Sequence, residues 1–378
     1  MAIYNTMIIG LLKEPAFETR TSLLPEHAIL LKKMNVELII ESGAGEKAFA
    51  SDEKYKAEGA TVGNRQEVLQ KATVILSINT LSESDVQSAK GKVLIGFFQS
   101  LVNAKLISSW AQQNCVVFSM DMLPRTTRAQ SMDVLSSQAN IAGYKAVLLA
   151  ANLYPKYFPM FMTAAGSIPP AKILILGAGV AGLQAIATSK RLGAVIEVFD
   201  TRPAVKEEVM SLGAKFIEVE GAADASKAGG YAVEQSEEFQ QRQKAKIAES
   251  VAKADIIITT AQIPGRKAPI LITKEMIDKM KSGSVIIDLA AVTGGNTEYT
   301  KDDETVFVNG VMIVGNSKLP GSMPSDASKL YGKNILNFLQ LIVSKDGQLN
   351  LNFEDDLVLG TCVAKEGAVS NERVKSII

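Results

Sequence analysis

The chain has 378 residues, of which 47% are apolar and 21% charged, a composition typical of a globular protein and a length that suggests about two domains. Its 40 basic and 40 acidic residues leave no net charge, which argues against nucleic acid or acidic lipid as a partner held by electrostatics. The two cysteines, Cys115 and Cys362, lie far apart in apolar surroundings, so we expect neither a disulfide framework nor a metal site.

The N-terminus does not have the pattern of a signal peptide. No basic stretch precedes the apolar residues 7–12, and Lys13-Glu14-Pro15 follows at once. The long uncharged stretch at residues 173–189 is interrupted by glycines, so we expect no membrane-spanning segment. These features predict a cytoplasmic chain.

The first part of the chain alternates apolar runs with amphipathic stretches. The runs that indicate buried strands are residues 7–12, 36–40, 73–78, 93–97 and 115–119. The stretches that indicate helices are residues 25–34, 65–70, 83–89 and 103–113. Alternating strands and helices predict one doubly wound α/β domain, with a parallel sheet covered by helices on both faces.

A polar segment at residues 125–140 comes next and leads into an apolar helix at residues 141–153. Prolines and glycines between residues 155 and 170 then interrupt the pattern. A second α/β unit follows this break.

A glycine-rich turn opens the second unit, between an apolar strand and a helix. Gly177 permits the tight turn, Gly179 lets a pyrophosphate approach the backbone, and Gly182 lets the helix pack closely on the sheet. Asp200 follows the next strand, where a carboxylate binds a ribose 2′-hydroxyl. Arg202 is the kind of residue that accepts a 2′-phosphate, but the adjacent acidic group would repel one. The pattern therefore favours NAD over NADP.

The strands of this unit are expected at residues 172–176, 195–199, 214–217, 255–259, 284–288 and 311–314, which predicts a six-stranded Rossmann fold. A small, polar segment containing Gly230 and Tyr231 is either a solvated connection or a lid beside the cofactor. It precedes a charged helix from residue 233 to about residue 253.

The tail begins with a helix at residues 326–343 whose apolar face needs a partner. That face consists of Leu330, Ile335, Phe338, Leu339 and Ile342. We expect it to return to the first domain, giving residues 1–140 plus 325–378 as a discontinuous Rossmann-like domain and residues 141–324 as the nucleotide-binding one. Two linkers would then form a hinge over a cleft between two doubly wound domains.

The sequence offers few groups for proton transfer. Its one histidine, His27, starts an amphipathic helix and is expected to be a partly exposed helix residue. Neither a serine-hydrolase signature nor a Walker-type phosphate loop is present. Hydride transfer directly between two nicotinamides needs neither, because no proton moves.

The polar segment and several later motifs resemble the NAD(H)-binding component of proton-translocating nicotinamide nucleotide transhydrogenases. The motifs are Arg125-Thr-Thr-Arg-Ala-Gln130-Ser-Met-Asp133-Val-Leu-Ser136, Ala139-Asn-Ile-Ala-Gly-Tyr, Pro169-Pro-Ala-Lys, Gly177-Ala-Gly-Val-Ala-Gly, Phe199-Asp-Thr-Arg-Pro, Gly230-Tyr-Ala, Thr259-Thr-Ala, Asp288-Leu-Ala-Ala and Gly294-Gly-Asn. The resemblance covers nearly the whole chain, and the Arg-Gln-Asp loop is specific to this family.

The resemblance implies a set of site residues. Gln130 would orient the dihydronicotinamide through its ribose, with Arg125, Asp133 and Ser136 completing the polar network. Asp200, with the neighbouring Thr201 and Arg202, would hold the adenosine ribose and phosphates, and Tyr231 would close a mobile loop. Further cofactor contacts would come from Arg128, Gly177, Gly179, Val180, Gly182, Gly230, Thr260 and Ala261.

The resemblance also implies partners. NADH on this chain would reduce NADP⁺ on a partner domain, coupled to proton movement through a membrane-spanning component. The chain would be dimeric and peripherally associated with the bacterial inner membrane through those subunits. No metal is implied.

Two alternatives remain. Alanine dehydrogenase shares the fold and resembles the chain in Lys13-Glu14 and Glu18-Thr-Arg20, where an arginine would bind a substrate carboxylate. That enzyme needs a lysine and a histidine at two strand ends that here read Ile78-Asn79-Thr80 and Phe97-Phe98-Gln99. The other alternative is a non-catalytic NAD-binding protein, which would have no need of the polar loop.

Overall fold

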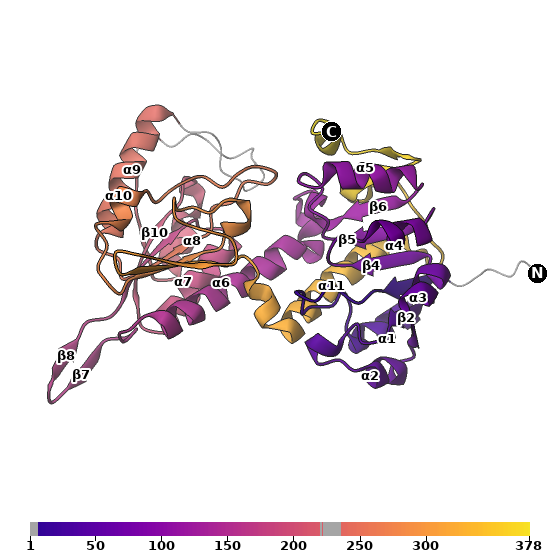
Figure 1. Ribbon diagram of the computed structural model, residues 1–378, viewed down its shortest axis with the longest axis horizontal. Helices are drawn as coiled ribbons and strands as arrows, with labels where there is room; N and C mark the ends of the chain where they lie inside the picture. The colour runs from indigo at the N-terminus through magenta and orange to yellow at the C-terminus, as the bar shows by residue number, and fades with distance from the viewer. Residues whose placement is uncertain (1–6, 220, 222–235) are drawn as a thin grey trace, which may run out of the picture. The chain divides into compact units, whose positions relative to one another are not determined.

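The computed structural model describes residues 7–219, 221 and 236–378 (Figure 1). The chain forms two compact units. The first unit contains the chain up to Gln138 together with Gly321–Ile378, and the second unit contains Ala139–Pro320. The first unit is therefore built from two separate stretches of chain.

In the described part of the first unit, eight strands form one sheet in the order β17-β16-β6-β5-β4-β1-β2-β3. The strands are β1 (Ile8–Leu11), β2 (Glu37–Glu41), β3 (Thr61–Gly63), β4 (Val74–Ser77), β5 (Val93–Gly96), β6 (Val116–Ser119), β16 (Cys362–Lys365) and β17 (Ala368–Val369). Strands β1 to β6 are parallel, whereas β16 pairs antiparallel with β6 and with β17.

The helices of this unit are α1 (Pro25–Lys33), α2 (Asp52–Ala57), α3 (Arg65–Lys71), α4 (Glu83–Ser88), α5 (Ala104–Gln112), α11 (Pro324–Ile342), α12 (Asp356–Thr361) and α13 (Glu372–Lys375). Short 3-10 helices add η1 (Glu46–Ala48), η2 (Met120–Met122) and η3 (Thr127–Met132).

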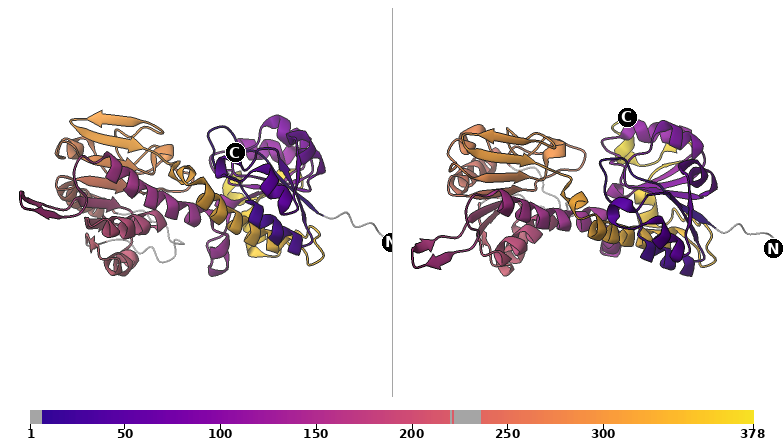
Figure 2. Two further views of the ribbon diagram at one scale, coloured as in Figure 1. Left: turned by 90° about the horizontal axis from the view of Figure 1, so that it is seen from below. Right: turned by 60° about the horizontal axis from the view of Figure 1, so that its bottom comes forward.

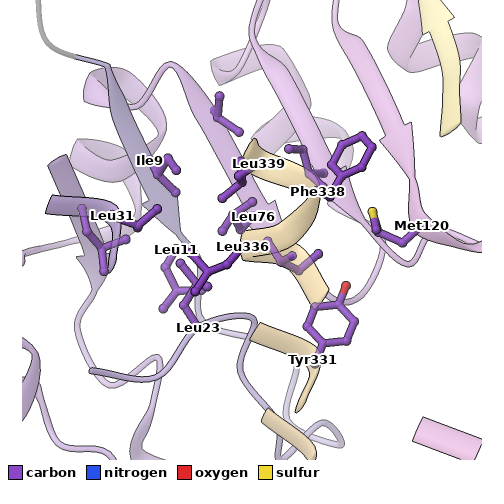
Figure 3. Close-up of a cluster of buried hydrophobic side chains, with 14 of the residues drawn as sticks. Ile9, Leu11, Leu23, Leu31, Leu76, Met120, Tyr331, Leu336, Phe338 and Leu339 are labelled. Carbon is purple, nitrogen blue, oxygen red and sulfur yellow. The ribbon is translucent and has the colours of Figure 1, made fainter. Parts of the chain in front are cut away.

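Successive side chains of a strand point to opposite faces, which builds a separate core on each side of this sheet. Leu76 of β4 packs with α1 and α11, including Phe338 and Leu339 (Figure 3). Its neighbour Ile75 packs with α3, α4 and α5, including Trp110. Helix α11 thus covers one face of the first sheet.

In the described part of the second unit, seven strands form a sheet in the order β11-β10-β9-β12-β13-β15-β14. The strands are β9 (Lys172–Leu176), β10 (Val195–Phe199), β11 (Lys215–Phe216), β12 (Ile256–Thr259), β13 (Val285–Asp288), β14 (Thr305–Val308) and β15 (Val311–Gly315). All pairs are parallel except β14 with β15. A separate hairpin joins β7 (Phe161–Thr163) to β8 (Gly166–Ile168).

Helices cover both faces of the second sheet (Figure 2). They are α6 (Val134–Leu153), α7 (Val180–Arg191), α8 (Lys206–Ser211), α9 (Glu237–Val251) and α10 (Lys274–Ile277). Three 3-10 helices, η4 (Pro203–Val205), η5 (Ala291–Thr293) and η6 (Leu319–Ser322), complete the elements. Helices α6, α7 and α8 share a core with Ile173 and Ile175 of β9, while α9 and α10 share one with Leu174 and Leu176. The α/β class with two parallel-dominated sheets is confirmed.

The sheets hold more strands than the sequence pattern predicts. The six-stranded prediction for the second sheet is wrong because β14 adds an antiparallel edge through a two-residue hairpin. Asn309 and Gly310 form that turn with φ of 50° and 79°, the left-handed backbone that an Asn-Gly pair favours between hairpin strands. The first sheet likewise gains β3, β16 and β17, which the sequence pattern does not predict.

Two other expectations are corrected by packing. His27 is buried rather than partly exposed, because its Nδ1 accepts a hydrogen bond from Leu24 N (2.9 Å) and its ring lies against Gly332 of α11, where a Cβ would meet it at 2.3 Å. Leu330 is 41% exposed, and Tyr331 is buried in its place. Both cysteines are buried and free.

Candidate functional site

The glycine-rich turn joins β9 to α7 at the carboxyl end of the second sheet. Gly177 has φ of 105°, and a Cβ there would lie 2.4 Å from Thr260 Oγ1. A Cβ on Gly182 would lie 1.9 Å from the Gly177 carbonyl oxygen, so α7 packs directly on the turn. Among the described residues, no atom lies within 4 Å of the Cβ position of Gly179. The backbone at the start of α7 is therefore open to an approaching phosphate group.

Asp200 links this turn to the end of β10. Its carboxylate accepts hydrogen bonds from Ala178 N (2.7 Å) and from Arg202 N (2.8 Å), and it pairs with the Arg202 guanidinium through Nε (2.9 Å) and Nη2 (2.7 Å). The bond to Asp200 raises the pKa of Arg202. Arg202 is thus held on a carboxylate, which offsets the charge it would offer to a phosphate.

The segment after β12 completes the carboxyl edge next to the turn. Thr260 Oγ1 donates to the carbonyl oxygens of Leu176 (3.3 Å) and Gly177 (3.2 Å). Asn296 brackets Ala261, accepting from its N–H (3.0 Å) and donating to its carbonyl (2.9 Å). These bonds fix the backbone at residues 260–261 beside the glycine turn.

Asn296 is itself fixed by Asp288 at the end of β13. Both side chains are fully buried, and Asp288 accepts from Asn296 N (2.6 Å), Ala290 N (2.9 Å) and Thr300 Oγ1 (2.6 Å). The motifs that contain Asp288 and Asn296 are visible in the sequence, but their role in supporting Ala261 is not. The bonds from Asn296 to Ala261 join residues 35 positions apart, which local sequence patterns do not reveal.

The polar loop, residues 125–136, belongs to the first unit. Asp133 accepts from Ser136 N (3.0 Å) and Ser136 Oγ (2.6 Å), which caps the start of α6. This cap explains why α6 begins at Val134 and not at residue 141. Arg128 pairs with Asp355 and Asp356, and Gln130 is exposed.

The structure therefore brings together only some of the residues expected in the loop. Asp133 and Ser136 form one hydrogen-bonded group, and Arg128 is engaged by the C-terminal stretch. Arg125 is exposed. Val180 is 39% exposed at the start of α7, and Thr201 is half-buried after Asp200. Gly230 and Tyr231 lie outside the described residues.

The carboxyl edge of the first sheet carries a chain of polar contacts that are buried or partly buried. Glu14 accepts from Ile78 N (2.5 Å) and from Asn79 Nδ2 (3.0 Å). The Asn79 amide also reaches Glu18 (3.3 Å), which pairs with Arg20 through Nε (2.9 Å) and Nη2 (2.7 Å). We call Glu14, Asn79, Glu18 and Arg20 the first-edge cluster.

Burial sets the protonation of the acids in this cluster. It raises the pKa of Glu14 to about 7. Burial acts the same way on Glu18, but the bonds from Arg20 outweigh it and hold its pKa below the ordinary value. Arg20 also donates to Gln138 Oε1 (2.8 Å). Each of the three guanidinium nitrogens of Arg20 thus donates to a protein group.

Two strand ends of the first sheet carry no lysine or histidine. Asn79 follows β4, and Gln99, which follows β5, donates its N–H to Asp121 Oδ1 (3.2 Å). The chain's one histidine is no substitute, because burial lowers the pKa of His27 to about 4 and leaves it neutral near pH 7. Neither strand end offers the lysine or histidine that would exchange a proton with an amino acid.

Within the ranges described above, no group of histidine, cysteine and acidic residues is arranged to hold a metal ion. None of the helices in those ranges combines the length and apolar character needed to cross a bilayer.

Comparison with known proteins gives a consistent result. Residues 10–142 match the family model for the alanine dehydrogenase/PNT N-terminal domain, and residues 146–372 match that for the C-terminal domain. The first part of the NAD(P) transhydrogenase subunit alpha of Rhodospirillum rubrum is 45% identical over 362 residues, covering 93% of this chain and 94% of the relative.

Solved structures agree with the sequence match. A transhydrogenase from Sinorhizobium meliloti is 45% identical, with a TM-score of 0.87 over 96% of this chain and 99% of that one. An L-alanine dehydrogenase is 22% identical, with a TM-score of 0.81 over 98% of this chain and 99% of that one, and shares the fold.

Proposed function

Because the chain belongs to the alanine dehydrogenase/PNT family, we propose that it is the NAD(H)-binding component of an NAD(P) transhydrogenase. In this role it gives a hydride from NADH directly to NADP⁺ held on a partner domain. Movement of protons belongs to a membrane-spanning component. The coupled reaction therefore requires subunits besides this chain.

Two observations carry the proposal: the nucleotide turn is open, and the ends of β4 and β5 carry neither lysine nor histidine. Gly179 leaves the start of α7 accessible, while Asn79 and Gln99 stand where an amino-acid dehydrogenase needs a lysine and a histidine. Hydride transfer from one nicotinamide to another needs orientation and no proton relay. An alanine dehydrogenase-like reaction is disfavoured for the same reason.

The choice of NAD(H) rests on Asp200. Its carboxylate lies at the end of β10 and pairs with Arg202. A 2′-phosphate here would be repelled by the carboxylate, and the charge of Arg202 is already balanced by that same group. A ribose 2′-hydroxyl donates to a carboxylate without this penalty. The adenosine end of NAD(H) would lie against Asp200, Thr201 and Arg202.

The remaining contacts follow from the family resemblance. Gly177, Gly179, Val180 and Gly182 would receive the pyrophosphate, and Thr260 and Ala261 would line the same edge. Gln130 would orient the dihydronicotinamide through its ribose. Arg125, Arg128, Asp133 and Ser136 would support Gln130, and Gly230 and Tyr231 would close over the nucleotide.

The β7–β8 hairpin supports a homodimer. Its side chains include Phe161 and Met162, which are 43% and 76% exposed, and Ile168, which is 39% exposed. The hairpin projects from the rest of its unit (Figures 1 and 2), and a two-stranded hairpin is marginally stable alone in water. A second copy of the chain would cover this apolar surface. The dimer would associate with the bacterial inner membrane from the cytoplasmic side through the other subunits.

The test mixes the chain and NADH with an NADP⁺-loaded partner subunit and follows hydride transfer by stopped-flow absorbance. We expect rapid transfer, and a fluorescence titration should show much tighter binding of NADH than of NADPH. Gln130→Asn should leave NADH affinity nearly unchanged and slow the transfer. An alanine-dependent reduction of NAD⁺, or equal affinity for the two nucleotides, would contradict the proposal.

A further inference from the structure

Two asparagines on α11 hold the polar loop at one carbonyl group. Asn334 Nδ2 and Asn337 Nδ2 each donate to the Ser131 carbonyl oxygen at 2.8 Å. Residues three apart lie on the same face of a helix, which brings both amides to one point. A carbonyl oxygen has two lone pairs, and these two donors use both.

The position of this carbonyl matters because Ser131 follows Gln130. Around it, Ala129 and Met132 are buried in the first-unit core, while the Gln130 side chain is exposed. A 3-10 helix leaves its last carbonyls without partners of its own, and η3 ends at Met132. The asparagines therefore fix the main chain at the end of η3, directly beside Gln130.

Other contacts restrain the loop on either side of this point. On the C-terminal side, Asp133 caps α6 through Ser136. On the N-terminal side, Arg128 pairs with Asp355 and Asp356, but its side chain is 49% exposed, and exposed ion pairs contribute little. The side chain of Asn334 is buried, so its bond is the better protected anchor.

We propose that Asn334 and Asn337 are positioning residues that set the place from which Gln130 acts on the dihydronicotinamide. The inference rests on the proposed function, because it assigns the asparagines to the same hydride transfer. They touch neither cofactor nor substrate in this role. Misplacement of a group by about 1 Å costs up to about a hundredfold in rate. Loss of the two asparagine bonds to the Ser131 carbonyl, which we call the clamp, should therefore slow the transfer step.

The experiment uses the full chain with its NADP⁺-loaded partner subunit. Asn337→Asp has the shape of the native side chain but no amide donor, whereas Asn337→Gln keeps a donor at a half-exposed position. Asn334→Ala removes the buried donor. Gln340→Ala, an exposed position one turn further along α11, is the matched control.

Three quantities are measured: NADH affinity, the single-turnover rate of hydride transfer, and the primary deuterium isotope effect with NADH deuterated at C4. We expect Asn337→Asp and Asn334→Ala to slow transfer between about ten- and a hundredfold, with NADH affinity within about twofold of wild type. The isotope effect should rise toward its full value as the hydride step becomes limiting. Asn337→Gln should transfer hydride faster than Asn337→Asp but more slowly than wild type. The control Gln340→Ala should transfer at the wild-type rate.

The outcomes separate the two proposals. A wild-type chain that transfers no hydride overturns the proposed function and the clamp with it. A wild-type chain that transfers normally, beside an Asn337→Asp variant with unchanged rate and isotope effect, overturns only the clamp. If Asn334→Ala fails to fold, Asn337→Asp alone decides, since Asn337 is half-exposed. Equal losses in Asn337→Asp and Asn337→Gln would also overturn it, because the donor would then be irrelevant.

Discussion

The two units present contrasting carboxyl edges on related parallel sheets. At the second edge, the glycine turn leaves open space at Gly179 beside a fixed Asp200. At the first edge, Glu14, Asn79, Glu18 and Arg20 bond to one another. Parallel α/β sheets bind ligands at this end of their strands. The two edges therefore differ in what they offer a ligand: the second has open backbone, and the first has side chains that are already bonded to one another.

The largest effect is expected at the open edge, where one glycine is needed for helix packing and another for access of the nucleotide. Gly182→Ala would put a Cβ 1.9 Å from the Gly177 carbonyl oxygen, so the turn must move; we expect NADH affinity to fall more than about a hundredfold and stability to fall by ~2 kcal/mol. The new methyl group of Gly179→Ala meets no atom of the described residues, so this variant should weaken NADH binding with little loss of stability. Titration and urea unfolding on both variants test this. Normal NADH binding by Gly179→Ala would contradict the proposal that the pyrophosphate approaches the backbone at this residue.

Arg20→Ala tests whether the first edge is closed. The variant leaves the buried Glu18 carboxylate without its ion-pair partner, and breaking such a pair costs about 3 kcal/mol. The loss should be seen in the free energy of unfolding while NADH affinity stays near the wild-type value. The double variant Glu18→Gln, Arg20→Met removes both charges and should lose less. An Arg20→Ala protein as stable as wild type would show that the cluster is solvated and the edge open.

The pH dependence of stability tests the same cluster through Glu14. Its pKa is about 7 in the folded chain against 4.5 as a free side chain, so the folded state holds the proton more tightly. The resulting stabilisation is complete below about pH 4.5 and is lost as the pH rises through 7, by at most ~3 kcal/mol.

Urea unfolding of wild type and Glu14→Gln at several pH values measures this. The stability difference between wild type and variant should fall between pH 5 and pH 8. His27 has the opposite slope, losing stability as the pH falls from 6.5 to about 4, but both proteins keep it and its contribution cancels. A difference independent of pH would mean that Glu14 is hydrated.

The smallest effect concerns nucleotide choice at the open edge. Asp200→Asn removes the carboxylate charge that holds Arg202, so the affinity for NADPH relative to NADH should rise about tenfold, or ~1.4 kcal/mol. Glu197→Gln is the control, because Glu197 lies on β10, just before Asp200, but pairs with Lys215. Fluorescence titration of both variants with both nucleotides gives the ratio. A similar change of the affinity ratio in the control would show that the loss of any negative charge near β10 is sufficient.

The sequence predicts the second edge better than the first. The glycine spacing and Asp200 are local signals, because the conformation of the glycines depends only on the short turn between β9 and α7. The bonds of Asp133 to Ser136 are local too, since a capping residue lies within three positions of the N–H that it accepts. The start of α6 at Val134 could therefore have been predicted from Asp133 alone. The Asn309-Gly310 turn was also a readable signal for β14.

The first-edge cluster could not be predicted in this way. Glu14 bonds to Asn79 across 65 residues of chain, and Arg20 bonds to Gln138 across 118. The hydrogen-bond partner of a buried acid depends on the order of the strands in the sheet, and local periodicity does not predict that order. The asparagines of α11 have the same origin, because Ser131 lies about 200 residues earlier, across 203 and 206 positions. Residues of this kind are identified only when the tertiary contacts are known.

The divided first unit has a consequence for the order in which the chain matures during synthesis. Helix α11 covers one face of its sheet, and β16 pairs with β6, yet both belong to Gly321–Ile378. The second unit is one continuous stretch, Ala139–Pro320, and is able to complete its core first. At a translation rate of about 5–20 residues per second, the early strands wait on the order of ten seconds or more for α11 to emerge. During that interval the face that Phe338 and Leu339 later cover is exposed on the nascent chain, where a chaperone is best placed to bind it.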